Sequence, residues 1–373
     1  GAAAGSRDLD PRTIRELLFT AMAVSQTRPE IALVILQMTT TALQPSGVLG
    51  SDRAPGFSAD TADTDLEIWY LIAWALYARA IAEPDALDEP VTRADGEQRS
   101  AWDCLMSAIA WIRDEIGTGP HDLVRIGAGD WNRLLDNAGR QGKGESVLNS
   151  AALAFALHAL IEIARRQDRL QVEELEQLDG WRRALTQAVG EAFDGRWFCR
   201  AYADDGTTIG GSCDDRIFLD VQAWAVLARC GTERQRQMAL DAALDRGDGT
   251  PGPRIISPPL PLTPPCPYTT HRLPPQQDWN GGVSPMVGAW LVWALAEQGK
   301  IEQAQQHWEQ LACRRLICEA ELPVDGRLTP HGFIPDSALS QHHVRPLGAH
   351  HIFGWQHLAL AMIAGQPRNK PNA

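Results

Sequence analysis

Residues 127–146 bring together side chains that could bind and cleave a sugar. Five glycines and several polar residues make this stretch too irregular for a helix or a strand, so we expect a loop. Sugar sites combine an aromatic ring, which covers the apolar face of a pyranose, with carboxylates and amides that bind its hydroxyls. Among the groups of this kind in the loop, and the cations beside them, the candidates are Asp130, Trp131, Asn132, Arg133, Asp136, Lys143 and Glu145.

Two further polar clusters precede predicted helices. One is residues 60–67, with Asp63 and Asp65, and the other is residues 276–284, with Trp279 and Asn280. Each cluster also has a purely structural interpretation. Either aspartate could cap the helix that follows it, and Trp279, like Trp131, could anchor its loop.

Helical periodicity covers most of the chain. Eleven segments fit, in consecutive antiparallel pairs, and twelve helices in two concentric rings would form an (α/α)6 toroid. A different all-α arrangement such as a solenoid is the alternative, but the sequence has no repeat of fixed period. The predicted helices are 11–25, 29–44, 65–82, 100–117, 146–166, 172–192, 217–230, 233–245, 284–298, 301–317 and 349–364.

Two segments interrupt this pattern. Residues 196–209 alternate partly and contain Asp205-Gly206, which predicts a small β-hairpin. Residues 251–275 are rich in proline and cannot be helical, so we expect a long loop that packs on the body through Ile255, Ile256, Leu260 and Leu262. No linker divides the chain, and we predict one domain over 1–373, with 1–9 a cloning remnant or a disordered start.

Composition narrows the classes of partner. The net charge is −13 and no run of lysine or arginine occurs, which argues against a nucleic-acid partner or an anionic membrane. No apolar run is long enough for a membrane span, and no signal peptide is evident, so we expect a cytoplasmic protein. Seven scattered cysteines and ten histidines form no metal-binding spacing, so we expect free thiols, no metal and no cofactor.

Several motifs in order resemble the catalytic domain of the cellobiose phosphorylase type, glycoside hydrolase family ninety-four. They are Gly119-Pro120-His121-Asp122-Leu123, Gly129-Asp130-Trp131-Asn132, Gly142-Lys143-Gly144-Glu145-Ser146, Asp205-Gly206-Thr207, Ser257-Pro258-Pro259, Asn280-Gly281-Gly282 and Gly354-Trp355. The resemblance implies an (α/α)6 domain that cleaves β-glucosides with inversion, using phosphate as the nucleophile. Such phosphorylases also have an N-terminal β-sandwich that contributes to the dimer; this sequence does not include one, and we expect a monomer.

The chain departs from the family pattern at three positions. The family has Asp-Trp-Asn-Asp-Gly, in which the second aspartate is the general acid, and Arg133 stands in its place here. Arginine is not a proton donor at neutral pH. The histidine that helps to hold phosphate in the family is replaced by Met286, and Trp279 stands where the family has a glutamate before Asn-Gly-Gly.

Three hypotheses follow for an oligosaccharide ligand. The first is an inverting hydrolase with a relocated acid: Asp136, or else Glu145 or Asp130, with a base such as Glu321, Asp325 or Asp336. The second is a sugar-binding or regulatory protein that has lost the chemistry. The third is a phosphorylase in which Arg133 binds phosphate or an acidic substrate. We further expect Asp65, Trp131, Arg133, Glu145 and Trp279 to line one open pocket.

Overall fold

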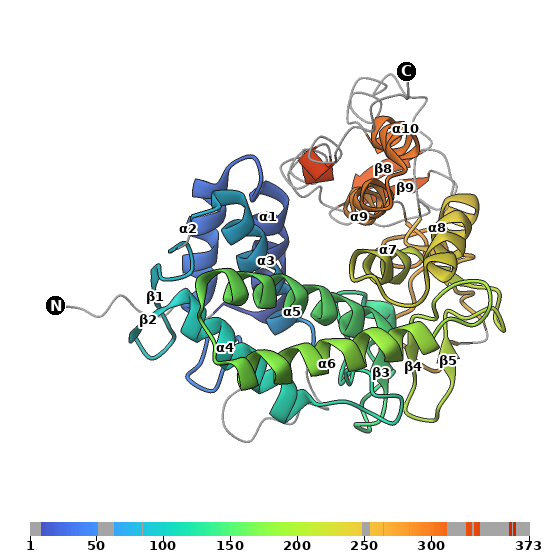
Figure 1. Cartoon of the computed structure of the whole chain (residues 1–373). Helices are drawn as coiled ribbons and strands as arrows, with labels where there is room; N and C mark the ends of the chain where they lie inside the picture. Colours follow the sequence, from blue (N-terminus) through green and yellow to red (C-terminus); the bar gives the residue numbers. More distant parts are fainter. Residues whose placement is uncertain are drawn as a thin grey trace, which may run out of the picture.

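Ten α-helices alternate between an inner and an outer ring in the described part of the chain. The computed structural model describes residues 9–50, 63–83, 85–247, 254–263, 265–282, 284–311, 326–329, 332–335, 358–359 and 361–362. Every described inner helix except the last packs against the next inner helix, and each packs against its own outer partner. Figure 1 shows the pairs following one another around a ring, from α1 and α2 through α5 and α6 to α9 and α10. The predicted (α/α)6 toroid is confirmed.

The inner helices are α1 (Pro11–Val24), α3 (Leu66–Ile81), α5 (Val147–Gln167), α7 (Leu219–Leu227) and α9 (Pro285–Glu297). The outer helices are α2 (Pro29–Thr40), α4 (Ala101–Trp111), α6 (Val172–Glu191), α8 (Glu233–Gly247) and α10 (Ile301–Leu311). A π-turn, η3 (Ile112–Ile116), extends α4. The predicted helix 349–364 falls mostly outside the described residues, although its four described members are helical. A single domain over 1–373 remains a prediction.

Short antiparallel strands link the loops. They pair as β1 (Pro90–Thr92) with β2 (Gln98–Ser100), β3 (Glu145–Ser146) with β4 (Ala201–Tyr202), β4 with β5 (Thr208–Ile209), β6 (Ile217–Phe218) with β7 (Ile256–Ser257), and β8 (Gly326–Thr329) with β9 (Gly332–Pro335). The predicted hairpin is β4–β5, which turns through Asp205 and Gly206 with the glycine at φ +82°. The described residues between β7 and α9 contain no helix, as the prolines predict.

Helix starts follow local rules. Asp10 caps α1 by accepting a hydrogen bond from the amide of Thr13, and Pro11 occupies the first turn. The hydroxyls of Ser146 and Ser284 cap α5 and α9 in the same way. As a consequence, the loops that precede the inner helices end on fixed backbone positions at one end of the ring.

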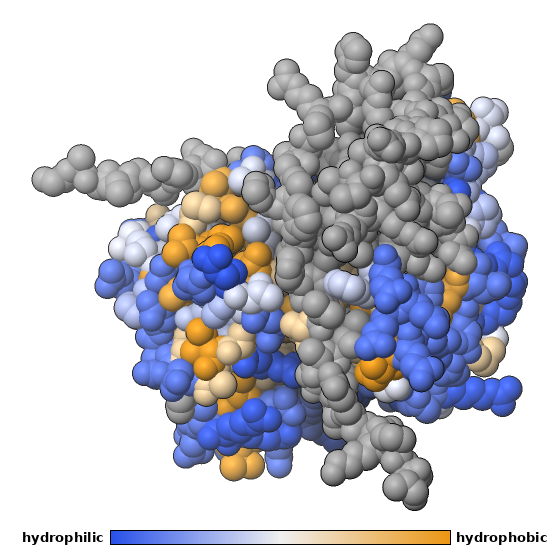
Figure 2. All heavy atoms as spheres, turned by 90° about the horizontal axis from the view of Figure 1, so that it is seen from above, coloured by the Kyte–Doolittle hydropathy of each residue, from blue (hydrophilic) through white to orange (hydrophobic). Residues whose placement is uncertain are grey.

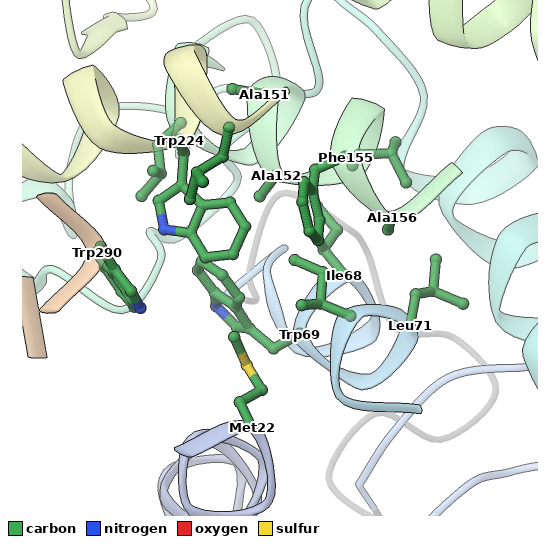
Figure 3. Close-up of a cluster of buried hydrophobic side chains, with 14 of the residues drawn as sticks. Met22, Ile68, Trp69, Leu71, Ala151, Ala152, Phe155, Ala156, Trp224 and Trp290 are labelled. Carbon is green, nitrogen blue, oxygen red and sulfur yellow. The ribbon is translucent and has the colours of Figure 1, made fainter. Parts of the chain in front are cut away.

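Tryptophans from three inner helices fill the centre of the toroid (Figure 3). Trp69 stacks on Trp290 with ring centroids 5.7 Å apart, and Trp224 packs edge-on against both. All three rings are buried. Aromatic burial of this size, with edge-to-face geometry, is a large stabilising contribution and explains why α3, α7 and α9 hold one register.

The outer surface is mostly hydrophilic with small apolar areas, as Figure 2 shows for one face. Among described residues the exposed large hydrophobics are Ile31, Val34, Val172 and Leu262. Among the described helices, α5 is the one that is long and apolar enough to cross a membrane, and 89% of its most apolar stretch is buried inside the fold. It packs against α3, α6 and α7 as a core helix.

Candidate functional site

The loops that lead into α3, α5, α7 and α9 meet at one end of the ring. The amide of Thr64 donates to the carbonyl of Gly129 at 3.1 Å, which joins the α3 and α5 loops. The amide of Val147 donates to the carbonyl of Arg200 at 3.2 Å, which joins α5 to the loop before α7. The amide of Asn137 donates to the carbonyl of Tyr268, which adds the proline-rich segment. Loops that precede three inner helices, together with the proline-rich segment, therefore converge at one end of the ring.

Arg200 is the centre of a buried ionic cluster at this end. Its Nη2 donates to both oxygens of Asp130, and its Nε donates to Oδ2 of Asp220 at 3.0 Å. The indole Nε1 of Trp131 donates to the same Asp220 oxygen at 3.0 Å. The hydroxyl of Ser146 lies 3.3 Å from both Asp130 and Arg200. One guanidinium thus joins residues from the loop before α5, the loop before α7 and α7 itself.

A second cluster links α1 to the start of α3. Arg15 donates from Nε and Nη2 to the two oxygens of Asp65, at 2.9 and 2.7 Å, and from Nη2 to Asp63 at 2.7 Å. The indole of Trp69 donates to Asp65 at 2.8 Å. Asp65 occupies the N-cap position of α3, but its carboxylate makes no capping hydrogen bond. The capping interpretation is therefore wrong for Asp65, because its side chain turns toward Arg15 instead.

Each cluster holds one cation and two carboxylates, so negative charge is in excess. Burial raises the pKa of Asp130 to about 6; Arg200 opposes this rise, and Asp65 and Asp220 add to it. Burial alone would lower the pKa of Arg15, but attraction to Asp65 and Asp63 outweighs it and raises that pKa. Near neutral pH both arginines therefore stay charged, while Asp130 takes up a proton as pH falls through about 6.

Glu145 fixes the Gly119–Leu123 motif. Its carboxylate accepts from the amides of His121 and Leu123, at 2.9 and 3.2 Å, and faces Nδ1 of His121 at 2.5 Å. Glu145 is 1% exposed, whereas the ring of His121 is half exposed and stacks on Tyr202 at 4.1 Å. A Cβ on Gly119 would lie 2.6 Å from the Glu145 side chain. Two motifs that are distant in sequence thus form one structural unit.

Asp136 connects its loop to the proline-rich segment. Its Oδ1 accepts from the hydroxyl of Thr269 at 2.9 Å and from the amide of Thr270 at 2.7 Å, and its Oδ2 accepts from the hydroxyl of Thr270. Nη2 of Arg140 lies 3.8 Å away. The side chain is 13% exposed. Asp136 is thus the most accessible catalytic candidate, yet both its oxygens are occupied by hydrogen-bond donors.

Arg133 begins the 3-10 turn η4 (Arg133–Leu135), directly after Asn132. The side-chain oxygen of Asn132 caps this turn by accepting from the amide of Leu134 at 3.1 Å, and its Nδ2 is buried without a hydrogen-bond partner among described residues. The guanidinium of Arg133 is half-buried, and within the described part of the chain it forms no ion pair. The structure therefore places a cation where the family pattern has the general acid.

The remaining candidates lie in different environments. Lys143 is exposed, and its amide donates to Asp204. Asn280 is buried and holds the proline-rich segment, because its side chain exchanges hydrogen bonds with the backbone of Leu260. Trp279 is half-buried and packs against the core.

The expectation of one open pocket lined by five side chains is wrong. Asp65, Trp131 and Glu145 are no more than 4% exposed and direct their polar atoms to protein partners. Trp131 instead packs edge-on against Trp290 at 5.8 Å. Because the loops cross above the inner helices, these side chains lie beneath the surface of the site and hold its loops in place. The proposed bases Glu321, Asp325 and Asp336 lie outside the described residues.

Sequence reasoning missed the residues that hold these carboxylates. Arg15, Arg200 and Asp220 were not singled out, and neither was Asp204, which accepts three backbone amides of the Gln141–Gly144 turn. The sequence does contain a signal for two of them. Arg200 and Asp220 are single charges in otherwise apolar stretches, and a charge in such a position needs a buried partner.

Comparison with known proteins identifies the family of this chain. Residues 15–321 match the catalytic domain of the glycosyl hydrolase 94 superfamily. The chain belongs to this superfamily. This glycosyl hydrolase 94 domain is 32% identical over 201 residues to 3-O-beta-D-glucopyranosyl-beta-D-glucuronide phosphorylase of Paenibacillus borealis, a match that covers 53% of the chain and 26% of the relative.

Two further relatives cover more of the glycosyl hydrolase 94 domain. The cyclic beta-(1,2)-glucan synthase NdvB of Rhizobium meliloti is 29% identical over 69% of the chain and 10% of its own length. The cellobionic acid phosphorylase of Neurospora crassa is 26% identical over 67% of the chain and 32% of its own length. The chain thus spans about a third or less of each of these curated relatives.

Solved structures share the fold of the glycosyl hydrolase 94 domain. A structure titled "Glycosidase Wild Type" superposes with a TM-score of 0.58 and covers 95% of this chain and 88% of its own. The GH63 mannosylglycerate hydrolase from Thermus thermophilus in complex with glucose gives a TM-score of 0.55, with 95% and 92% coverage. Both are 14% identical to this chain, so the likeness is one of fold.

Proposed function

We propose that this domain binds a β-linked gluco-oligosaccharide, or a related glycoside, at the loop end of the toroid without cleaving it. Family membership supports a carbohydrate ligand, and a relative named 3-O-beta-D-glucopyranosyl-beta-D-glucuronide phosphorylase supports the β linkage. The observation that carries the second part is the identity and environment of Arg133. It follows Asp130-Trp131-Asn132 without a gap, in the place of the family's proton donor.

Two other carboxylates of the loop, Asp130 and Glu145, do not replace that donor. Asp130 is fully buried against Arg200, and Glu145 is buried against His121 and Leu123. An inverting glycosidase needs an acid within reach of the leaving oxygen, on the opposite side of the sugar from the base or nucleophile. Neither buried carboxylate offers an accessible oxygen for that purpose.

The proposal is tested by incubating the protein with β-linked gluco-oligosaccharides, with and without phosphate, while binding is measured by calorimetry. We expect saturable binding, with no release of free sugar and no sugar 1-phosphate. Turnover at a rate well above the uncatalysed reaction would contradict the non-catalytic part, and absence of binding would contradict the ligand class.

A second candidate function is inverting hydrolysis with Asp136 as the acid. Its specific support is partial exposure and position: Asp136 follows the η4 turn, and its backbone lies against Gly129. The release of free sugar by the wild type and its loss in Asp136→Asn would favour this function over binding alone. Phosphate-dependent formation of sugar 1-phosphate would instead favour a phosphorylase.

A further inference from the structure

Three arginines share one carboxylate on the pair of helices α5 and α6, which run side by side (Figure 1). The Nε of Arg182 donates to Asp179 at 2.8 Å, and both residues belong to α6. Arg165 of α5 and Arg183 of α6 lie 3.6 and 3.8 Å from the same carboxylate. One negative charge therefore faces three positive ones.

The cluster continues around His158 of α5, which lies 3.8 Å from Glu162 on the same helix. Burial lowers the pKa of His158 and Glu162 opposes this, while the nearby charges of Arg182, Arg229 and Arg79 lower the pKa further. Arg79 and Arg229 are exposed, and neither forms an ion pair with any residue that the structure describes. Their guanidiniums are therefore available to a partner.

These residues reverse the charge of the protein locally. We define the arginine cluster as the five arginines around His158 and Asp179, namely Arg79, Arg165, Arg182, Arg183 and Arg229. In the described part of the chain, Asp179 and Glu162 are the carboxylates within 4.0 Å of these arginines or of His158. The whole chain carries a net charge of −13, yet this region has arginines in excess. Such a reversal concentrates anions where it occurs.

Helix dipoles explain only part of the cluster. Arg79 and Arg165 lie in the last turns of α3 and α5, where the helix dipole favours a cation. Arg182 and Arg183 lie in the middle of α6, where the dipole gives no such advantage. Arg229 directly follows the C-cap of α7. The cluster thus lies where inner helices end, whereas the candidate site lies at the loops that precede them.

A surface cavity of about 350 Å³ adjoins the cluster, and Arg182 and Arg183 both line it. A Cβ on Gly190 would lie 3.0 Å from the Cα of Gly231, so at this point the backbone of α6 meets the segment before α8 with no side chain between them. The described lining includes one carboxylate, that of Glu191. The cavity therefore gives an extended chain a place to lie beside two arginines.

We propose that the arginine cluster and the adjoining cavity bind an acidic segment of a partner protein, rich in aspartate and glutamate. Charge complementarity favours this occupant. A small anion reaches one or two guanidiniums, whereas these five come from three helices and the residue after a fourth, so a segment with several carboxylates can contact them together. The overall charge of −13 disfavours a nucleic acid. The inference goes beyond the proposed function, because the cluster is separate from the sugar site.

The test measures binding of a fluorescent glutamate-rich peptide of about ten residues to the full chain, by anisotropy at low salt. A peptide with glutamine in place of glutamate is the neutral comparison. We expect saturable binding of the acidic peptide alone. Arg183→Gln combined with Arg229→Gln should weaken it about tenfold, and both positions are exposed, so the fold should be retained. Asp179→Asn should tighten binding, because it removes the carboxylate that the arginines share.

The matched control combines Arg12→Gln with Arg113→Gln. Like Arg229, Arg12 is exposed and forms no ion pair with described residues, and like Arg183, Arg113 is an exposed arginine beside an aspartate. The control removes the same charge outside the cluster and should bind the acidic peptide as the wild type does.

Several outcomes would overturn the inference. Equal binding of the two peptides, or equal weakening in the cluster variant and the control, would show that the cluster does not recognise carboxylates. Tighter binding of single-stranded DNA of matched charge would assign the cluster to nucleic acid. Full displacement of the peptide by equimolar inorganic phosphate would identify a small-anion site, and self-association that the cluster variant abolishes would assign the surface to a second copy of the chain.

Discussion

The Nη2 of Arg200 lies 2.9 and 2.8 Å from the two carboxylate oxygens of Asp130, with both side chains fully buried. Asp220 accepts a hydrogen bond from the Nε of the same guanidinium. Asp130 is therefore part of the framework that joins the loops before α5 and α7. Its oxygens are not available to a ligand.

Arg200→Ala should lower the free energy of unfolding by about 3–5 kcal/mol, because it leaves two buried carboxylates without their cation. Urea denaturation followed by circular dichroism measures this loss. Arg113→Ala, which breaks an exposed pair with Asp114, is the control and should have a much smaller effect. Equal losses in the two variants would show that burial does not set the strength of the Arg200 cluster.

Asp130→Asn should alter how stability depends on pH. The pKa of Asp130 is raised to about 6 by burial, against about 3.9 in an unfolded chain. Between these values the folded state holds a proton that the unfolded state lacks, so this carboxyl adds stability as pH falls from about 6 to about 4. The added stability is lost as pH rises through about 6.

The asparagine variant cannot titrate, so its free energy of unfolding should gain less than the wild type over that window, by about 1–3 kcal/mol. Denaturant melts at half-unit steps of pH would reveal the difference. Parallel curves for the two proteins would contradict the assignment to Asp130.

Glu145→Ala should destabilise the fold by about 1–3 kcal/mol, because the buried amide of Leu123 loses its acceptor. His121→Ala removes only the half-exposed ring on the other side of the pair and serves as the comparison. We expect its effect to be smaller in thermal denaturation. A larger loss in His121→Ala would indicate that the ring, and not the amides, is what Glu145 supports.

Asp136→Asn should loosen the connection to the proline-rich segment. An amide group is a weaker acceptor than a carboxylate, so the backbone amide of Thr270 should exchange with solvent about tenfold faster. Hydrogen exchange followed by mass spectrometry or NMR measures this. Asp205→Asn, in the β4–β5 turn, is the control, because it should change exchange at Thr207 and not at Thr270.

Arg133→Asp should introduce glycosidic cleavage if the missing proton donor is what keeps the domain inactive. General acid catalysis contributes about 10²–10⁴ in rate, so free sugar should appear at a level well above that of the wild type. Arg133→Asn has a side chain of similar size to aspartate without an acidic proton, and it should stay inactive. Cleavage by the wild type as fast as by Arg133→Asp would refute the proposed loss of chemistry.

Fold class could be predicted from the sequence because helices obey local rules. The 3.6-residue period predicted nine of the ten described helices to within a few residues, with α2 and α7 shorter than expected, and the predicted end of the tenth at residue 317 lies outside the described residues. The proline-rich segment and the Asp205-Gly206 turn were equally local signals. Ile255, Ile256 and Leu260 are buried as predicted, whereas Leu262 is exposed. The prediction failed for Leu262 because nothing in the order of residues says which of these four neighbours reaches the core.

The order of residues was enough to establish which residue types gather at the loop end, and that Arg133 stands where the family has an acid. Which of those residues are accessible was settled by helix packing. Asp65 and Asp130 are buried because Arg15 and Arg200, 50 and 70 residues away along the chain, donate to them. Pairing across such separations depends on how the helices pack, and no local pattern encodes it.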